Sequence, residues 1–219
     1  MMFACTIPLI PHAMIPRLFR LNLMICWFHM NKHHKNFDEA KFSARKDNHC
    51  GYTFCPLCST KLIEKMRDGR LRMVCPRTEC GFVFYQNPVP AAGGFIVQDD
   101  QVLLVKRAHP PRIGWWCFPA GFMEWGEHPS ETAIREVKEE TGLDIKLGPF
   151  FEVYSGDDDP RTKAILILYL ANIIGGELHA ADDALEVRFF SFDELPKNIA
   201  FKSHIQALAD YNQRFRKRP

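Results

Sequence analysis

Apolar and polar positions alternate in blocks along the second half of the chain. Residues 91–97 and 101–107 are apolar runs separated by Asp99-Asp100, a pattern that predicts a β-hairpin. Three further apolar runs predict strands, at residues 143–154, 164–171 and 187–192. Segments with helical spacing predict helices at residues 129–141 and 201–216. This order of elements predicts an α/β (α+β) fold, in which one mixed sheet lies between helices.

The first third of the chain follows another pattern. Residues 1–30 are largely apolar, but prolines and arginines interrupt them, so no run reaches the about 18 uncharged apolar residues of a spanning helix. Two explanations stay open, an organelle presequence and a start codon assigned too early, and we favour the second, with Met24 or Met30 as the first residue. Residues 31–49 are polar and basic and predict a flexible leader.

These patterns divide the chain into four segments. They are an N-terminal extension at residues 1–49, a small cysteine-containing module at 50–86, a main domain at 87–196 and a C-terminal helix at 197–219. The link between module and main domain is stiffened by Pro88 and Pro90, because proline fixes its own backbone and restricts the preceding residue.

Composition adds little to this division. The formal net charge of +2 on 219 residues gives no reason to expect a membrane or a nucleic acid as partner. The eight cysteines fall partly into paired clusters, which favours metal binding in the reducing cytoplasm over a set of disulfides.

The cysteine-containing module predicts a zinc ribbon. Two knuckles, sixteen residues apart, hold the expected ligands Cys55, Cys58, Cys75 and Cys80. Four thiolates on two short turns suit tetrahedral zinc, and a segment of this size needs a bound metal or a covalent cross-link to fold. The neighbouring Cys50 and His49 could replace one of these ligands.

Basic residues of the module lie close to aromatic ones in the sequence. The basic residues are Lys61, Lys65, Arg67, Arg70, Arg72 and Arg77, and the aromatic residues are Tyr52 and Phe54. Such a mixture can bind a single nucleic-acid strand. We favour the simpler interpretation of a solvated surface, with the ribbon bracing the main domain or a homodimer contact.

Three glutamates share one face of the helix expected at residues 129–141. At about 100° per residue, Glu136, Glu139 and Glu140 fall within roughly a third of a turn. Like charges this close destabilise a helix, and a divalent cation, which binds carboxylate oxygens, removes the repulsion. Arg135 offers a planar, charged fork that can hold one of the carboxylates. The alternative is an acidic face that is only solvated.

A longer motif surrounds these glutamates. From Gly121 onward the chain reads GFMEWGE, then seven further residues, then REVKEETGL. This stretch resembles the Nudix box, G-x5-E-x7-R-E-U-x-E-E-x-G-U with U aliphatic, at every specified position. The specified positions are Gly121, Glu127, Arg135, Glu136, Glu139, Glu140 and Gly142. Residues 114–121 resemble the family's G-x-W-x-x-P-G-G lead-in, with Ala120 in place of one glycine; that replacement suits a backbone contribution but not a positive φ.

The resemblance implies a hydrolase of diphosphate linkages that depends on Mg²⁺ (or Mn²⁺). The implied metal ligands are Glu136, Glu139, Glu140, the backbone carbonyl of Ala120 and, in a supporting role, Glu127. Arg135 is implied as the group that holds the carboxylates. The family's general base varies and is often a glutamate on a later loop, so Glu186 is the first candidate and Glu139 the second.

The module followed by the box resembles a zinc-ribbon subgroup of the Nudix family that acts on ADP-ribose or FAD. The resemblance covers about residues 53–196. NADH pyrophosphatases share the layout but carry an SQPWPF-type motif after the box, where residues 148–156 here read GPFFEVYSG. A small nucleotide diphosphate is therefore the expected substrate. The alternatives are hydrolysis of nucleoside triphosphates or dinucleoside polyphosphates, and a non-catalytic sensor, which would gain nothing from the repelling glutamates.

Overall fold

The structure is a computed structural model that describes residues 51–159 and 162–216. The presequence, alternative start and flexible leader expected in residues 1–49 lie outside the described residues, as do His49 and Cys50. In the described ranges, no helix is both long enough and apolar enough to cross a membrane.

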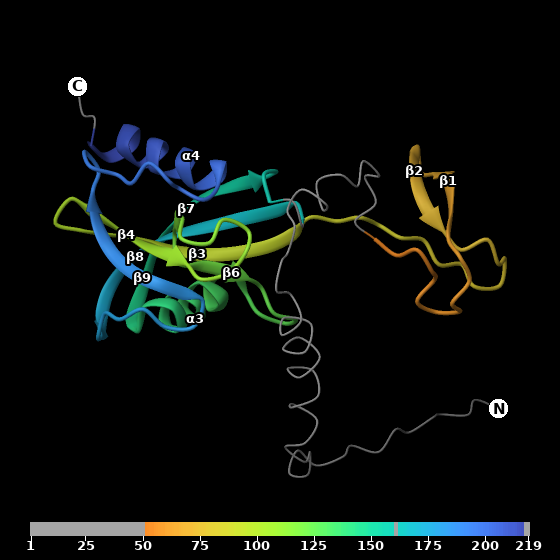
Figure 1. Ribbon diagram of the computed structural model, residues 1–219, viewed down its shortest axis with the longest axis horizontal. Helices are drawn as coiled ribbons and strands as arrows, with labels where there is room; N and C mark the ends of the chain where they lie inside the picture. The colour runs from red at the N-terminus through yellow and green to blue at the C-terminus, as the bar shows by residue number, and fades with distance from the viewer. Residues whose placement is uncertain (1–50, 160–161, 217–219) are drawn as a thin grey trace, which may run out of the picture. The chain divides into compact units, whose positions relative to one another are not determined.

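The cysteine-containing module holds a two-stranded antiparallel hairpin, made of β1 (Ile63–Arg67) and β2 (Arg70–Val74) (Figure 1). The two strands meet at Asp68-Gly69, where both residues have positive φ, at 52° and 73°. That conformation is the tight turn whose twist matches the twist of the two strands, and an Asp-Gly pair adopts it readily. Few apolar side chains of the module are buried: Cys55 and Leu62, at 2% and 3% exposure, and Val74 of β2, at 7%.

The main domain contains the five strands and two helices expected from the sequence, with some shifted ends, and two further short strands at residues 116–117 and 120–122. Its strands are β3 (Val89–Gln98), β4 (Gln101–Arg107), β5 (Trp116–Cys117), β6 (Ala120–Phe122), β7 (Leu143–Gly156), β8 (Ala164–Gly176) and β9 (Ala184–Ser191). Its helices are α3 (Pro129–Thr141), α4 (Lys202–Tyr211) and a π-helical turn η1 (Asn212–Arg216). The helix expected at residues 129–141 is confirmed at both ends, whereas the closing helix changes to π-helical geometry at Asn212.

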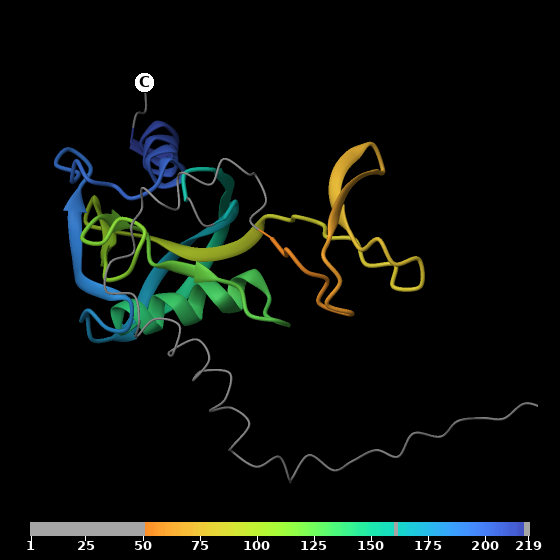
Figure 2. The ribbon, with the colours of Figure 1, turned by 45° about the vertical axis from the view of Figure 1, so that its right-hand side comes forward.

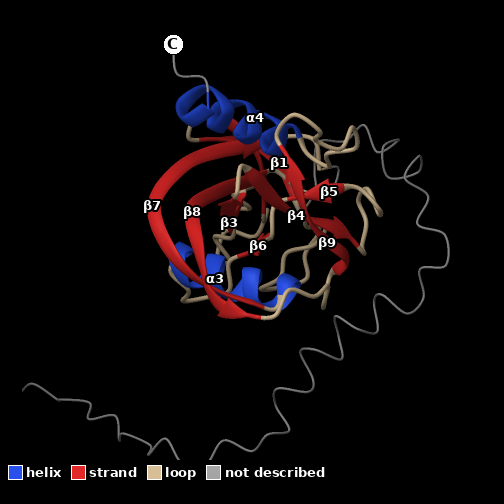
Figure 3. Ribbon diagram, turned by 90° about the vertical axis from the view of Figure 1, so that its left-hand side faces the viewer, coloured by secondary structure: helices blue, strands red, loops and turns tan. Residues whose placement is uncertain are grey.

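The sheet is mixed, as expected. Its strand order is β5-β4-β3-β8-β7, with β6 also pairing with β3 and β9 with β4 (Figure 3). The pairing of β3 with β8 is parallel and the others are antiparallel. The expected hairpin is confirmed only beside its turn, where Val97 pairs with Val102. Farther from the turn, β3 pairs with β6 and β8 instead, which brings the first strand of the domain next to the box.

A helix covers each face of the sheet, α4 on one side and α3 on the other (Figures 1 and 2). Neighbouring residues of a strand point to opposite faces, and the two cores follow this rule. Phe95 packs with Ala207 and Leu208 of α4, whereas Ile96 packs with Val137 of α3. Both faces of the central strands are buried, which accounts for their continuous apolar runs.

His204 links α4 to the segment that enters the box. It is 6% exposed, and its Nδ1 accepts a hydrogen bond from the backbone N–H of Phe118, with a donor–acceptor distance of 3.0 Å. The imidazole also stacks on the Phe118 ring, with centroids 5.3 Å apart. Burial lowers the pKa of His204 to about 3, so the ring stays neutral and can accept this bond at ordinary pH. The helix on the far face of the sheet thereby fixes the strand end that precedes Ala120.

Candidate active site

The box is built from β6, the following loop and α3. Helix α3 begins after His128, whose side chain accepts from Ser130 N–H while Glu131 accepts from His128 N–H, a reciprocal capping box. It ends at Gly142, in the left-handed region at φ 73°, as the box glycine predicts. A Cβ added to Gly121 would collide with the carboxylate of Glu136. The first box glycine therefore lets β6 approach the acidic face of α3.

Arg135 binds three carboxylates of the box at once. Its Nε and Nη2 donate to the two oxygens of Glu127, at 2.7 and 2.9 Å, which is the bidentate geometry of a guanidinium fork. Its Nη1 donates to Glu136 at 2.7 Å and to Glu139 at 2.9 Å. The sequence predicted that Arg135 holds one carboxylate. The structure shows it offsetting the charges of three.

Glu127 is the most firmly bound of these carboxylates. Besides both contacts from Arg135, it accepts from the Thr132 hydroxyl at 2.7 Å and from the Glu124 N–H at 3.0 Å. The Arg135 guanidinium and these donors lower the pKa of Glu127 to about 2. Its oxygens thus tie the loop to α3, and its supporting role at the metal stays a prediction.

The surroundings of Glu140 disfavour its charged form, whereas those of Glu127 favour it. Its side chain is buried, at 8% exposure, and its Oε2 accepts a single hydrogen bond from the Ala120 N–H, at 3.2 Å. Burial raises the pKa of Glu140 well above its usual range, and the negative charge of Glu136 raises it further. Burial also raises the pKa of Glu136 itself. Buried carboxylates repel each other unless a cation compensates them.

The lead-in segment tolerates the alanine at position 120. Ala120 pairs with Gly93 in the sheet and is not among the residues with positive φ. Glycine is therefore not required there, and the N–H remains free to bind Glu140. A Cβ added to Gly93 would collide with Ala120, so the glycine that this approach needs lies on the opposite strand.

Asp183 joins the acidic cluster, although it lies outside the box and was not predicted from the sequence. The loop before β9 is fixed to the end of α3 by a bond from Ala181 N–H to the Glu140 carbonyl, at 3.3 Å. It is fixed to the end of β4 by a bond from Ala108 N–H to the Asp183 carbonyl, at 2.8 Å. The charge of Asp183 raises the pKa of both Glu136 and Glu140. The acidic pair Asp182-Asp183, just before an expected strand, was the signal available in the sequence.

Glu186, the expected general base, lies farther along β9. It is directly opposite Lys106 of β4, and its Oε2 accepts from the Lys106 ammonium at 3.2 Å. Glu186 is not among the charges that act most strongly on Glu136 or Glu140. Its catalytic role stays a prediction, and Asp183 is a second candidate outside the box.

The donor set fits a divalent cation of the magnesium type. Glu136, Glu140 and Asp183 supply oxygen atoms only, and their charges disfavour one another. The carboxylates are not gathered around one point, because Arg135 draws Glu136 and Glu139 toward itself while Glu140 faces Ala120. A bound cation would compete with Arg135 for the carboxylates of Glu136 and Glu139.

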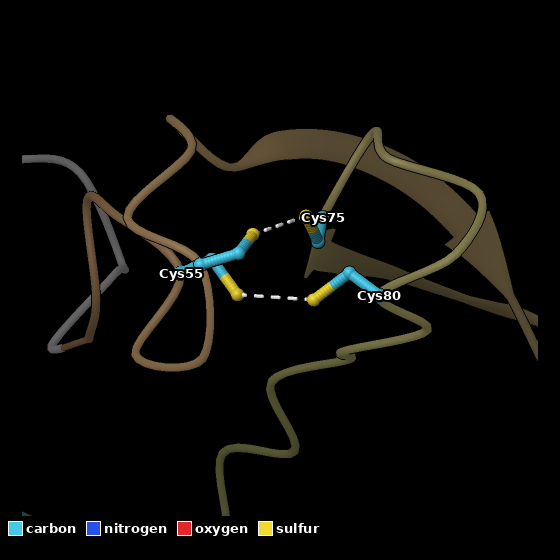
Figure 4. A group of neighbouring side chains, drawn as sticks. Cys55, Cys75 and Cys80 are labelled. Atoms are coloured by element: carbon cyan, nitrogen blue, oxygen red, sulfur yellow. Dashed lines mark hydrogen bonds between the residues drawn. The ribbon is translucent and has the colours of Figure 1, made fainter.

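The four cysteines of the module form the second candidate metal centre (Figure 4). Their sulfur atoms all lie within 4.8 Å of one another. Cys55 and Cys80 are 3.5 Å apart at sulfur, and so are Cys58 and Cys75. A tetrahedron with Zn–S bonds of 2.3 Å has edges of about 3.8 Å, so the observed spacing fits. None of the four is in a disulfide.

Comparison with protein families agrees with this site. The NUDIX domain model matches residues 87–211, more than half of the chain. The chain therefore belongs to the Nudix family, and it is a hydrolase of the pyrophosphatase type. The matched range extends through α4, which supplies His204.

Individual proteins of known sequence or structure are also similar to this chain. The chain is 44% identical over 128 residues to the ADP-ribose pyrophosphatase of Methanocaldococcus jannaschii, covering 58% of this chain and 75% of that protein. It is 30% identical over 160 residues to the NAD-capped RNA hydrolase NudC of Pseudomonas aeruginosa, covering 72% of this chain but only 54% of that protein. A solved NUDIX hydrolase from Nitrosomonas europaea covers 77% of this chain and 95% of its own, with a TM-score of 0.66 and 32% identity.

We predict that Glu140→Gln lowers turnover at least about 10²-fold without unfolding the protein, because it removes one charge from the cation site while its amide oxygen can still accept from Ala120. Steady-state assays at saturating magnesium check this. Lys138→Ala is the control on the same helix, since the Lys138 ammonium binds the Gly142 carbonyl and Asp144 rather than a carboxylate of the box. Near-normal turnover of the Glu140 variant would contradict the metal assignment.

Proposed function

We propose that this enzyme hydrolyses the diphosphate linkage of a nucleoside diphosphate derivative of the ADP-ribose type, with AMP as one product. The observation that carries the proposal is the acidic cluster of Glu136, Glu140 and Asp183 beside an intact box. The ADP-ribose pyrophosphatase similarity supports this substrate class, since the match covers three quarters of that relative. FAD and related dinucleotides belong to the same class.

The roles of the box residues follow from their surroundings. Glu136, Glu139 and Glu140 would hold Mg²⁺ or Mn²⁺, together with the Ala120 carbonyl. The bound cation supplies positive charge to the diphosphate and lowers the pKa of water near it. Arg135 and Glu127 keep the loop and helix in one arrangement, which fixes the backbone positions of the carboxylates.

Activation of water needs an acceptor for its proton. Two backbone hydrogen bonds hold the loop of Asp183 to the ends of α3 and β4, and the Asp183 carboxylate contacts the His109 imidazole at 3.1 Å. Glu186 and Glu139 remain the candidates from the sequence, and they contact Lys106 and Arg135. We place Asp183 first, because its charge acts on both Glu136 and Glu140.

Exposed aromatic side chains of the box offer a surface for a planar ring. Trp125 is fully exposed in the loop between β6 and α3, and Phe122 is 44% exposed at the end of β6. Trp116 and Phe118, by contrast, are buried in the core. Trp125 and Phe122, together with Trp115 at 40% exposure, are thus available to stack on a nucleobase or flavin.

We also propose that Zn²⁺ binds the four cysteines and has a structural role. The described module has only a very small apolar core, so metal ligation would supply much of its stability. All four positions are filled by cysteine, as in closed structural sites rather than catalytic ones.

The substrate prediction is tested by product analysis on a nucleotide panel with magnesium. ADP-ribose should yield AMP and ribose 5-phosphate, and reaction in ¹⁸O-labelled water should label only one product, because one water is activated. In the same assay, Asp183→Asn should lower kcat with the substrate KM within a few-fold, as for a group that acts in the transition state.

Glu186→Gln is the matched control for the base. If it shows the kcat loss and Asp183→Asn does not, the choice of base is wrong but the reaction stands. Rapid pyrophosphate release from a triphosphate such as 8-oxo-dGTP, or cleavage of a dinucleoside polyphosphate, with ADP-ribose, FAD and NADH untouched, would overturn the proposed substrate class.

The zinc prediction is tested by metal analysis of protein prepared without chelators, which should contain about one zinc per chain. Cys58→Ser should release this metal and increase hydrogen exchange in residues 51–86. Cys117→Ser is the control, because that buried thiol lies in the main domain and should leave the zinc content unchanged. Metal-free wild-type protein would rule the site out.

A further inference from the structure

The hairpin of the cysteine-containing module carries its positive charges on one face. In an antiparallel pair, directly opposite residues share a face and successive residues alternate. The register sets Lys65 opposite Arg72 and Arg67 opposite Arg70. All four side chains therefore project to the same side, and we call them the basic face. The other side carries Met66 opposite Leu71.

The basic face lacks internal compensation. Like charges in directly opposite positions of a sheet are destabilising, and this hairpin has two such pairs in succession. Among the residues that the structure describes, none of the four cations forms an ion pair with a carboxylate, and the Nε of Arg72 is buried without a hydrogen-bond partner. In the main domain the pattern differs, since Arg112, Arg135, Arg214 and Arg216 each bind a carboxylate.

An aromatic ring extends the basic face. The chain returns alongside β2, where Val83 bridges Val74 and Phe84 N–H donates to the Met73 carbonyl, at 2.8 Å. Tyr85 thereby lies beside Arg72, whose guanidinium is 4.5 Å from the ring centroid. Tyr85 is 48% exposed. A stacked guanidinium and phenol ring form a flat surface that can receive a nucleobase.

We propose that the basic face binds a single-stranded nucleic acid, with phosphates on Lys65, Arg67 and Arg70 and a base near Arg72 and Tyr85. Residues two apart on a strand lie roughly 7 Å apart, so the cations form a short row that an extended phosphodiester backbone can follow. Charge complementarity favours a polyanion, and the adjacent ring favours one that carries bases. From the sequence we favoured a solvated surface for these basic residues, and the strand register is what shows that the four cations share a face.

Fluorescence anisotropy tests the proposal with the full-length protein and a 3′-fluorescein-labelled oligouridylate of about twelve nucleotides. We expect salt-dependent binding, which weakens between ~50 and ~200 mM KCl. Arg67→Gln/Arg70→Gln should raise Kd at least about tenfold and reduce the slope of log K against log salt by about 1.4, since each lost phosphate contact contributes about 0.7 for single strands. A DNA strand of matching sequence distinguishes RNA from DNA as the source of the phosphodiester chain, and tighter binding of either supports the proposal.

The matched control is Lys146→Gln/Lys197→Gln, which removes the same charge from exposed positions of the main domain. It should change Kd by less than about threefold, and both double variants should retain zinc and ADP-ribose hydrolysis. Equal weakening in both variants would overturn the proposal, because net charge alone would then explain the binding. Absence of binding at ~50 mM salt, or stronger binding of a polyglutamate peptide than of either strand, would overturn it as well. These binding outcomes do not depend on which nucleotide the active site hydrolyses.

Discussion

The arrangement of the active site depends on one guanidinium. Arg135 binds Glu127, Glu136 and Glu139 with distances between 2.7 and 2.9 Å, and so joins the box loop to helix α3. Without it, the loop would lose the bidentate contact to Glu127, and the glutamates of α3 would repel each other without compensation. Arg135 compensates one side of the acidic cluster only. On the other side, Glu140 accepts a hydrogen bond from the Ala120 N–H, and Asp183 contacts the His109 imidazole with an Nε2–Oδ1 distance of 3.1 Å.

Helices on both faces of the sheet hold the residues of the active site in position. Helix α3 packs through Val137 on Ile96, which fixes the height of the glutamates above β3 and β6. On the opposite face, α4 fixes the lead-in segment through the bond between Phe118 and the neutral His204. The glycines at positions 93 and 121 allow the backbones to approach where a side chain would collide. The positions of Ala120 and Glu140 are thus set by packing on both sides of the sheet.

Local features were predictable from sequence, and features that depend on long-range pairing were not. Helix α3 was predicted with both ends, because Pro129 and Gly142 are strong local signals, and the box contained the three glutamates of its acidic face. The partners of β3 could not be predicted, since apolar runs do not specify which strand lies next to which. Asp183 was missed for the same reason. Its position depends on backbone hydrogen bonds from Ala181 to Glu140 and from Ala108 to Asp183, which join segments far apart in the sequence. Likewise, the basic residues of the hairpin were visible, but their common face requires the register.

We propose that Glu136, Glu140 and Asp183 form a cation site, whose like charges destabilise the folded protein until metal binds. The most direct measurement is the free energy of unfolding by urea, with and without saturating Mg²⁺, for wild type and Glu140→Gln. Without metal the variant should be the more stable protein, because a neutral amide replaces a buried carboxylate among like charges. With Mg²⁺ the order should reverse, since a ligand that binds only the folded state stabilises it in proportion to its affinity. A wild type that is the more stable protein without metal, and that gains nothing from Mg²⁺, would contradict the account.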